Sequence, residues 1–542
     1  MGKEFTLTLK EQLGVEQVNP RERRWIETPR NFLYLCLVLL FLHSTCMLYR
    51  YGELPSAPVI GDEVTINDPA IALSRGQGLR APSFGGSSFG LDRLYAHFPP
   101  VYIWTESLVF RAFGVSVYSL RLTTTVMGIL ACAIFLFIAW CLCRWGLADP
   151  VTMSFAACLY TLNASVIALH RIARMDTMVE LFALASLLFV LASIFCQFDS
   201  SIQNGADRDA EVRKKRFALL LAGAISAGLC MATHPEGLTA ILPILLLVLF
   251  AAPVRHRWKA MLLGLVATIP FAIWMIAYGS HWKQAIQQMR AILRNITPQP
   301  GILRYAHDFL RRSQQSIGQG MRAALFFLCL LVLGLLLERW VILWRSERGI
   351  ALEELDRSRL LLARVFALAS LLSLFLLIWF ISASITRYEV MYPIYLLGLA
   401  MVLRGVSLNK IGRRIAAGLS TALILAQVGA IAVYFGEKGE PPARFDSIVA
   451  LIPSGSRIAV TPKMRLSFVQ SGRPVTLLYL GYDGRKLWSI ANRNPLERFD
   501  AIVIDESFVD ERREYSPFAE EGRIERDFQV GSNVVHVYLP AK

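Results

Sequence analysis

The sequence predicts a polytopic α-helical membrane protein that carries a small α/β domain in its C-terminal part. Of the 542 residues, 55% are hydrophobic and only 18% are charged, whereas an ordinary soluble domain has about 25% charged residues. The mean hydropathy is +0.46, and apolar runs of about twenty residues recur, the length needed to cross a hydrocarbon core about 30 Å thick. An outer-membrane barrel would instead show short segments of alternating hydrophobicity.

The basic residues decide the predicted topology. They account for the net charge of +15 and lie beside the apolar runs, as is typical of the cytoplasmic ends of membrane helices, so we expect no nucleic-acid partner. About eleven helices put every strongly basic short connection on one side, with the N-terminus in the cytoplasm and the C-terminal part outside the inner (plasma) membrane. The predicted spans are about 31–48, 122–143, 151–169, 178–197, 217–233, 237–252, 260–278, 323–344, 361–381, 390–403 and 415–435.

One connection departs from this pattern. Residues 281–322 are strongly basic, yet the topology places them outside. Two interpretations of this segment stay open. Either it forms an amphipathic helix on anionic headgroups, or it forms a basic wall for a phosphate-bearing substrate.

The first long polar loop, residues 51–121, is predicted to form the floor of an active site. It opens with the acidic pair Asp62 and Glu63 and closes with His97, which is followed by Phe98 and two prolines. A chain that only spans a bilayer has no need of such a loop, and ordered loops of this length are usually functional.

Further acidic and basic residues gather at the outer ends of the predicted helices, whereas the inner ends carry mostly Lys and Arg alone. Each of these residues alone is explained as a helix-end anchor, but charges near membrane depth are costly and usually functional. A carboxylate there can act as a general base, and Arg or His can hold a phosphate. The set predicts glycosyl transfer from a lipid-phosphate sugar to an acceptor outside the cytoplasm. Its members beyond the first loop are Arg171, Arg174, Asp176, His234, Glu236, Arg387, Tyr388 and Glu389.

The C-terminal part, residues 436–542, is predicted to be a soluble extracytoplasmic α/β domain that follows a transmembrane domain of residues 1–435. It lacks a nucleotide fingerprint, a nucleophile elbow and metal-ligand spacing, so an accessory or acceptor-binding role is expected. All nine cysteines lie in the apolar runs, which indicates no disulfide framework. The predicted strands are 457–460, 475–479, 501–504 and 533–538, with helices at 444–451 and 486–492.

A series of short motifs follows this topology from residue 31 to residue 435. They are Asp62-Glu63, Pro99-Pro100, Phe113-Gly114-Val115-Ser116, Arg121-Leu122, Ala173-Arg174-Met175-Asp176-Thr177, Thr233-His234-Pro235-Glu236-Gly237, and Arg387-Tyr388 with Pro393. Their order and spacing resemble the GT-C glycosyltransferases. The most similar branch contains the lipid A aminoarabinose transferases and the protein O-mannosyltransferase-like enzymes.

The resemblance implies that the acidic residue Asp62 is catalytic, that the donor is a sugar on polyprenyl phosphate, and that the displacement inverts the configuration at the anomeric carbon. Asp62 is expected to act as the general base. Glu63 is expected to support Asp62 or to replace it as the base, because neighbours on an extended stretch point apart. Asp176 is expected to orient Arg174 or the sugar. One departure concerns the phosphate: many members of the aminoarabinose branch have Lys before the proline pair, where this chain has only the nearby His97.

The substrate-binding residues expected on the outer face are His97, Arg174, Asp176, His234, Glu236, Arg387 and Tyr388. The acceptor is a lipid such as lipid A, a protein or an envelope glycan. A membrane transporter or flippase of a lipid-linked sugar is the alternative function, although no internal repeat supports it, and a scaffold with a binding domain is a third. No cofactor is expected. A divalent metal is compatible with the oxygen and nitrogen ligands, but no spacing demands one.

Overall fold

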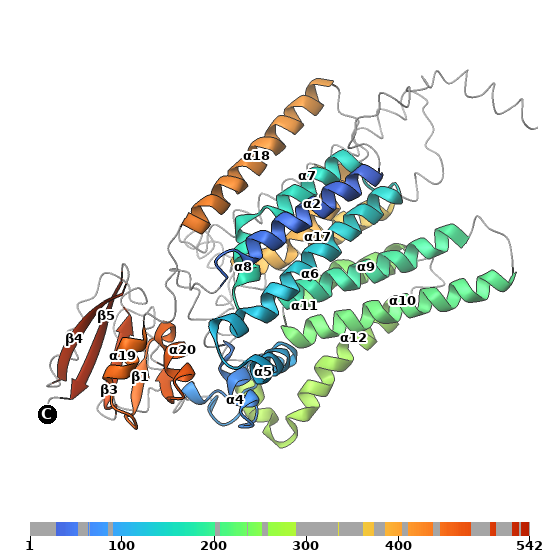
Figure 1. Cartoon of the computed structure of the whole chain (residues 1–542). Helices are drawn as coiled ribbons and strands as arrows, with labels where there is room; N and C mark the ends of the chain where they lie inside the picture. The colour runs from blue at the N-terminus through green and yellow to red at the C-terminus, as the bar shows by residue number, and fades with distance from the viewer. Residues whose placement is uncertain are drawn as a thin grey trace, which may run out of the picture.

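The structure is a computed structural model in which a bundle of apolar helices carries a five-stranded sheet at one end (Figure 1). The first loop lies at that same end, where α4 (Asp68–Ser74) and α5 (Val101–Phe113) are found. The residues that the structure describes are 29–51, 63, 66–84, 90–200, 206–235, 237–251, 258–288, 334, 361–372, 385–403, 410–436, 445–477, 499–505, 523–530 and 533–540.

Several described helices are long and apolar enough to cross a membrane. Within the ranges above there are four of these, or six if two bent helix pairs each count as one span. Shorter apolar helices occupy other predicted spans, and the span at 323–344 lies almost wholly outside the described residues. The bundle helices are α2 (Pro29–Leu48), α6 (Val117–Arg144), α7 (Pro150–Thr161), α8 (Ala164–Arg171), α9 (Asp176–Ser200), α10 (Ala206–Thr233), α11 (Gly237–Ala251), α12 (Trp258–Ala277), α17 (Ile385–Leu403) and α18 (Lys410–Gly436).

The predicted continuous span at 151–169 is broken in the structure. Helices α7 and α8 meet at an angle of 47°. The side chain of Asn163 accepts hydrogen bonds from the backbone N–H groups of Ser165 and Val166, so it caps a new helix where the apolar pattern alone predicts continuation. The break gives α8 a direction of its own, and α8 leads directly into the turn before α9.

The bundle helices approach one another closely through small residues. A Cβ atom on Gly228 of α10 would lie 2.8 Å from Pro270 of α12, and one on Gly223 would lie 3.2 Å from Val190 of α9. Such contacts are typical of membrane helices, where packing between helices replaces the hydrophobic effect as the main attraction. The core they surround includes Phe135 and Tyr160, whose ring centroids are 4.2 Å apart.

The C-terminal part contains a mixed sheet with the strand order β2-β1-β3-β5-β4. Strand β1 pairs in parallel with β2 and β3, and β5 pairs antiparallel with β3 and β4. The predicted strands coincide with four of these, and β4 was not predicted. The elements are α19 (Asp446–Leu451), β1 (Ile458–Val460), α20 (Pro462–Gln470), β2 (Val475–Leu477), β3 (Ala501–Asp505), β4 (Arg523–Val530) and β5 (Asn533–Pro540).

A second hydrophobic core joins the first loop to this sheet. Ile71 of α4 and Phe84 of the short 3-10 helix η3 (Pro82–Phe84) belong to the same buried cluster as Phe468 of α20 and Val503 of β3. Figure 1 shows α20 on the side of the sheet toward α4. The loop predicted to carry the site is therefore packed against the C-terminal part.

Candidate active site

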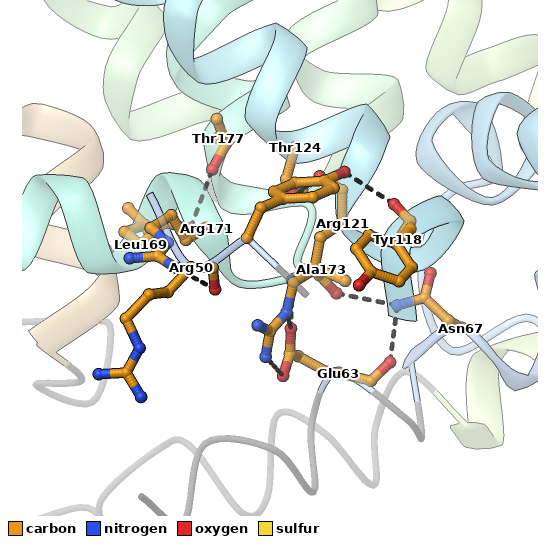
Figure 2. Close-up of polar contacts among 11 residues, drawn as sticks. Arg50, Glu63, Asn67, Tyr118, Arg121, Thr124, Leu169, Arg171, Ala173 and Thr177 are labelled. Carbon is orange, nitrogen blue, oxygen red and sulfur yellow. Dashed lines mark hydrogen bonds and ion pairs between the residues drawn. The ribbon is translucent and has the colours of Figure 1, made fainter. Parts of the chain in front are cut away.

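Glu63 of the first loop forms a buried ion pair with Arg121 near the start of α6 (Figure 2). Arg121 donates from Nε to Oε1 at 3.1 Å and from Nη2 to Oε2 at 3.2 Å, and both side chains are at most 2% exposed. A capping box between Ser116 and Ser119 fixes the first turn of α6, one turn before Arg121. The paired geometry fixes the start of the loop against the membrane helices.

The same carboxylate reaches the turn between α8 and α9. The backbone N–H of Ala173 donates to Oε1 of Glu63 at 2.9 Å. The Asn67 amide reinforces this contact, because it donates both to the backbone oxygen of Glu63, at 2.6 Å, and to that of Ala173, at 2.9 Å. Figure 2 shows the three residues around these bonds. The loop and the turn, which are about a hundred residues apart in the chain, are thus joined at one point.

The turn also carries the predicted pair Arg174 and Asp176. Arg174 donates from Nε to Oδ2 of Asp176 at 2.9 Å, and the two side chains are 17% and 6% exposed. Asp176 thus contacts Arg174, which was one of the two partners expected for it. A guanidinium oriented by a carboxylate is the kind of group that binds a phosphate or a sugar hydroxyl.

His97 and His234, predicted from different segments, both lie close to the ring of Phe98. The Phe98 ring centroid is 4.6 Å from that of His97 and 5.2 Å from that of His234. Burial, and then the neighbouring His234, lower the pKa of His97 to about 4. A neutral His97 at pH 7 can give a phosphate one hydrogen bond but no charge.

A small apolar cluster connects these parts. It contains Ile66 of the first loop, Tyr102 of α5, Met175 of the turn and Met178 of α9, with Phe98 packed against it. The structure therefore brings Glu63, His97, the Arg174–Asp176 pair and His234 around one cluster.

Sequence reasoning missed a second buried acid beside this cluster. Glu106 lies one turn beyond Tyr102 on α5, and both side chains are completely or almost completely buried. Burial raises the pKa of Glu106 well above its ordinary value, and the nearby Thr123 hydroxyl offsets this in part. The available signal was a lone acid one turn from a tyrosine in an apolar helix, which alone points to no chemistry.

The remaining predicted residues lie outside the described residues, wholly or in their side chains, or make contacts elsewhere. Asp62 and Glu236 lie outside the described residues, as do the side chains of Arg387 and Tyr388, whose backbone begins α17. Arg171, the last residue of α8, is held by α18: its guanidinium lies 5.6 Å and 4.9 Å from the ring centroids of Tyr434 and Phe435. It is a packing contact between helices.

Among the described residues, the group with metal-ligand spacing lies in the C-terminal sheet. Glu525, Asp527 and His536 place ligand atoms within 4.8 Å of one another on β4 and β5. Both carboxylates are exposed and already pair with the imidazole, at 3.1 Å and 2.8 Å, which accounts for the cluster as a surface ion-pair group.

Comparisons with known proteins show which proteins this chain is similar to in sequence and in fold. Residues 37–280 match the model of the dolichyl-phosphate-mannose-protein mannosyltransferase family. The structure is similar to that of ArnT from Cupriavidus metallidurans bound to undecaprenyl phosphate, with 14% identity and a TM-score of 0.53 over 93% of this chain and 97% of that chain. It is also similar to the Archaeoglobus fulgidus oligosaccharyltransferase, with 11% identity and a TM-score of 0.52 over 88% and 69% of the two chains. Curated protein sequences gave no match.

The fold and the family match together define a membrane glycosyltransferase of the GT-C class. The resemblance expected from the motifs is thereby confirmed, and both the ArnT-like and the mannosyltransferase-like branches fit. The part matched by the family model runs from within α2 to the 3-10 helix η5 (Gly279–His281), so it contains the first loop, α6 and the Arg174–Asp176 turn.

Proposed function

We propose that the protein transfers a sugar from a polyprenyl-phosphate-linked donor to an acceptor on the extracytoplasmic face of the membrane, with inversion at the anomeric carbon. The observation that carries the proposal is the bond from the Ala173 N–H to Glu63. It sets Glu63, the residue that follows Asp62 in the sequence, beside the turn that carries Arg174. A displacement at an anomeric carbon with a phosphate leaving group needs both a carboxylate base and a cation for the departing charge.

The donor phosphate is assigned to Arg174, with His97, His234 and Arg387 as further contacts. Arg174 is partly exposed, and its ion pair with Asp176 fixes the direction of its guanidinium. ArnT was solved with undecaprenyl phosphate and the Archaeoglobus fulgidus enzyme with a dolichol-phosphate and an inhibitory peptide. These ligands support a lipid-phosphate donor here and leave lipid, protein and glycan acceptors as candidates.

The role of general base is assigned to Asp62, the residue that precedes Glu63 in the sequence. Both oxygens of Glu63 already accept hydrogen bonds from Arg121, which suits Glu63 to holding the loop. In the reaction, Asp62 takes the proton from the acceptor hydroxyl or amine as that atom bonds to the anomeric carbon. The bond from this carbon to the phosphate oxygen breaks on the opposite face, and the lipid phosphate leaves with the electron pair.

The test compares envelope lipids and glycans by mass spectrometry in cells that lack the protein, express it, or express Asp62→Asn at the same membrane level. We expect one acceptor class to gain the mass of a sugar only with the native protein. A gain that Asp62→Asn supports equally would contradict the assigned base. Movement of a lipid-linked sugar across the membrane without any modified acceptor would instead indicate a flippase.

A further inference from the structure

A buried polar network inside the helix bundle takes no part in the proposed reaction. His43 of α2, Tyr160 of α7, His170 of α8 and Glu180 of α9 are all completely buried. His43 Nδ1 lies 2.9 Å from the Thr161 carbonyl oxygen, and His43 Nε2 lies 3.2 Å from His170 Nδ1. His170 Nε2 lies 2.9 Å from one Glu180 oxygen, and the Tyr160 hydroxyl donates to the other at 2.5 Å.

The proton count of this network follows from its contacts. The Thr161 carbonyl only accepts, so His43 must donate from Nδ1, and each of the contacts that His170 makes needs one proton between its two atoms. If every contact holds its proton, the net charge of His43, His170 and Glu180 together is zero. Either Glu180 is ionised beside one protonated imidazole, or all three groups are neutral. Net neutrality is what an apolar membrane interior demands.

The network closes the turn that carries the candidate site. His170 lies at the end of α8 and Glu180 lies one turn inside α9, so their hydrogen bond closes the segment that contains Ile172–Met175. We call this His170–Glu180 hydrogen bond the clasp. Inside this closed segment lie the Ala173 N–H, which holds Glu63, and the side chain of Arg174. Two further hydrogen bonds lie across the turn: Arg174 N donates to Ile172 O at 2.7 Å, and the Thr177 hydroxyl donates to Leu169 O at 3.4 Å.

Helix α6 is shaped to receive this clasp. A Cβ atom on Gly128 would lie 2.6 Å from both Cβ and Cγ of His170. That distance is far inside van der Waals contact, so only glycine lets α6 approach the imidazole. Gly128 therefore offers a way to displace His170 without removing any member of the network.

We propose that His170 and Glu180 are positioning residues whose hydrogen bond fixes the turn that holds Glu63 and presents Arg174. The assignment predicts that losing the clasp loosens the turn specifically, while a side chain that keeps the hydrogen bonds does not. Hydrogen exchange of the Ala173 amide, followed in peptides that cover the turn, measures this without any ligand.

Three variants separate a positioning role from general destabilisation. Glu180→Leu leaves Tyr160 and His170 without their partner, and we expect the Ala173 amide to exchange about tenfold faster or more. In Glu180→Gln the amide can accept from Tyr160 and donate to His170, which can still donate to His43, so exchange should stay near the native rate. Ser186→Ala is the matched control, because it removes a buried hydrogen bond to Gly223 O from the same helix but away from the turn.

The outcomes decide the proposal in each case. Native exchange at Ala173 in folded Glu180→Leu overturns it, as does exchange in Glu180→Gln or Ser186→Ala that matches the Leu variant. If Glu180→Leu does not fold, Gly128→Ala decides: faster exchange at the turn supports the clasp, and unchanged exchange overturns it.

A second readout rests on the proposed function. Because Arg174 lies inside the clasp, Glu180→Leu and Gly128→Ala should also weaken binding of undecaprenyl phosphate, used here as the probe. Faster exchange with unchanged binding supports the clasp and contradicts the donor role of Arg174. Unchanged exchange contradicts the clasp whatever the binding result, so the two failures can be told apart.

Discussion

Arg465 of α20 forms a buried ion pair with Asp68, the first residue of α4 and 397 positions earlier in the chain. Ser83 completes the group: its hydroxyl accepts from Arg465 Nε at 2.6 Å, and its backbone N–H donates to Asp68 at 2.9 Å. Both charges are removed from water, so each depends on the other. Together with the shared hydrophobic core, this pair joins the first loop to the C-terminal sheet as one packed unit.

Replacing Arg465 by Met should therefore damage the first loop as well as the C-terminal part. It leaves Asp68 buried and unpaired, which typically costs about 3–5 kcal/mol. We expect a lower unfolding temperature and easier proteolysis of the loop between α4 and α5. Arg457→Met is the control, because its ion pair with Asp500 is exposed and should matter little. Equal effects of the two substitutions would contradict the joint role of the Asp68–Arg465 pair.

The stability of the region around His97 should fall on mild acidification. The pKa of His97 is lowered by burial, and then by His234, to about 4 in the folded protein, whereas an unfolded histidine has a pKa of about 6.5. The folded state keeps His97 neutral, so its stability is complete above about pH 6.5 and is lost as pH falls toward about 4. The shift corresponds to at most about 3 kcal/mol, and residual solvent contact of His97 reduces it.

Thermal unfolding between pH 7.5 and pH 4.5 measures this effect in the native protein and in His97→Gln. The variant should lose part of the pH dependence because it has no proton to take up. If the variant keeps the full pH dependence of unfolding, that dependence belongs to other groups. This result would contradict the buried, neutral state of His97.

The sequence was sufficient for the class of fold and for several residues that the structure places close together. The apolar runs locate the bundle helices, and the outer-end residues Asp176 and His234 do lie near Glu63 and His97 in the structure. Strand β4 was missed because its alternation is weak: Arg523–Val530 is mostly polar, and its residues 524–527 are all exposed. Its partner β5, with Val535 and Val537 buried, carries the expected pattern.

The contacts that fix the site could not be predicted, because they depend on how the loop folds. Glu63 and Arg121 were both singled out, but their pairing joins residues 58 positions apart. The acidic pair was treated as two candidate bases, and in the structure Glu63 holds the loop in place. The clasp of His170 and Glu180 was also missed, because single polar residues in apolar helices show no partner in the sequence.

Removing Arg174 should weaken donor binding with little loss of fold. Its guanidinium is partly exposed, and charge-assisted hydrogen bonds contribute about 1.5–3 kcal/mol each, so we expect Arg174→Ala to lower affinity for undecaprenyl phosphate roughly ten- to a hundredfold. Arg144→Ala is the matched control, because it removes one charge from the far end of α6, where Arg144 lies 5.3 Å from the Trp140 ring centroid. Equal affinities in native protein and Arg174→Ala would refute the donor assignment.

The last prediction concerns the base. A positioned general base typically contributes 10²–10⁴-fold in rate, so Asp62→Asn should lose about that much turnover while it keeps the fold and the binding of undecaprenyl phosphate. Glu63→Gln should behave differently. It leaves Arg121 buried without its charge partner, so unfolding stability should fall by about 3–5 kcal/mol, and turnover should fall because the loop moves. Turnover of each variant, measured beside its unfolding temperature, separates these cases: lost turnover with native stability marks the base, and lost turnover with lower stability marks the support. If Asp62→Asn turns over at the native rate and a stable Glu63→Gln does not, the base is Glu63. If both turn over normally, the proposed mechanism is wrong.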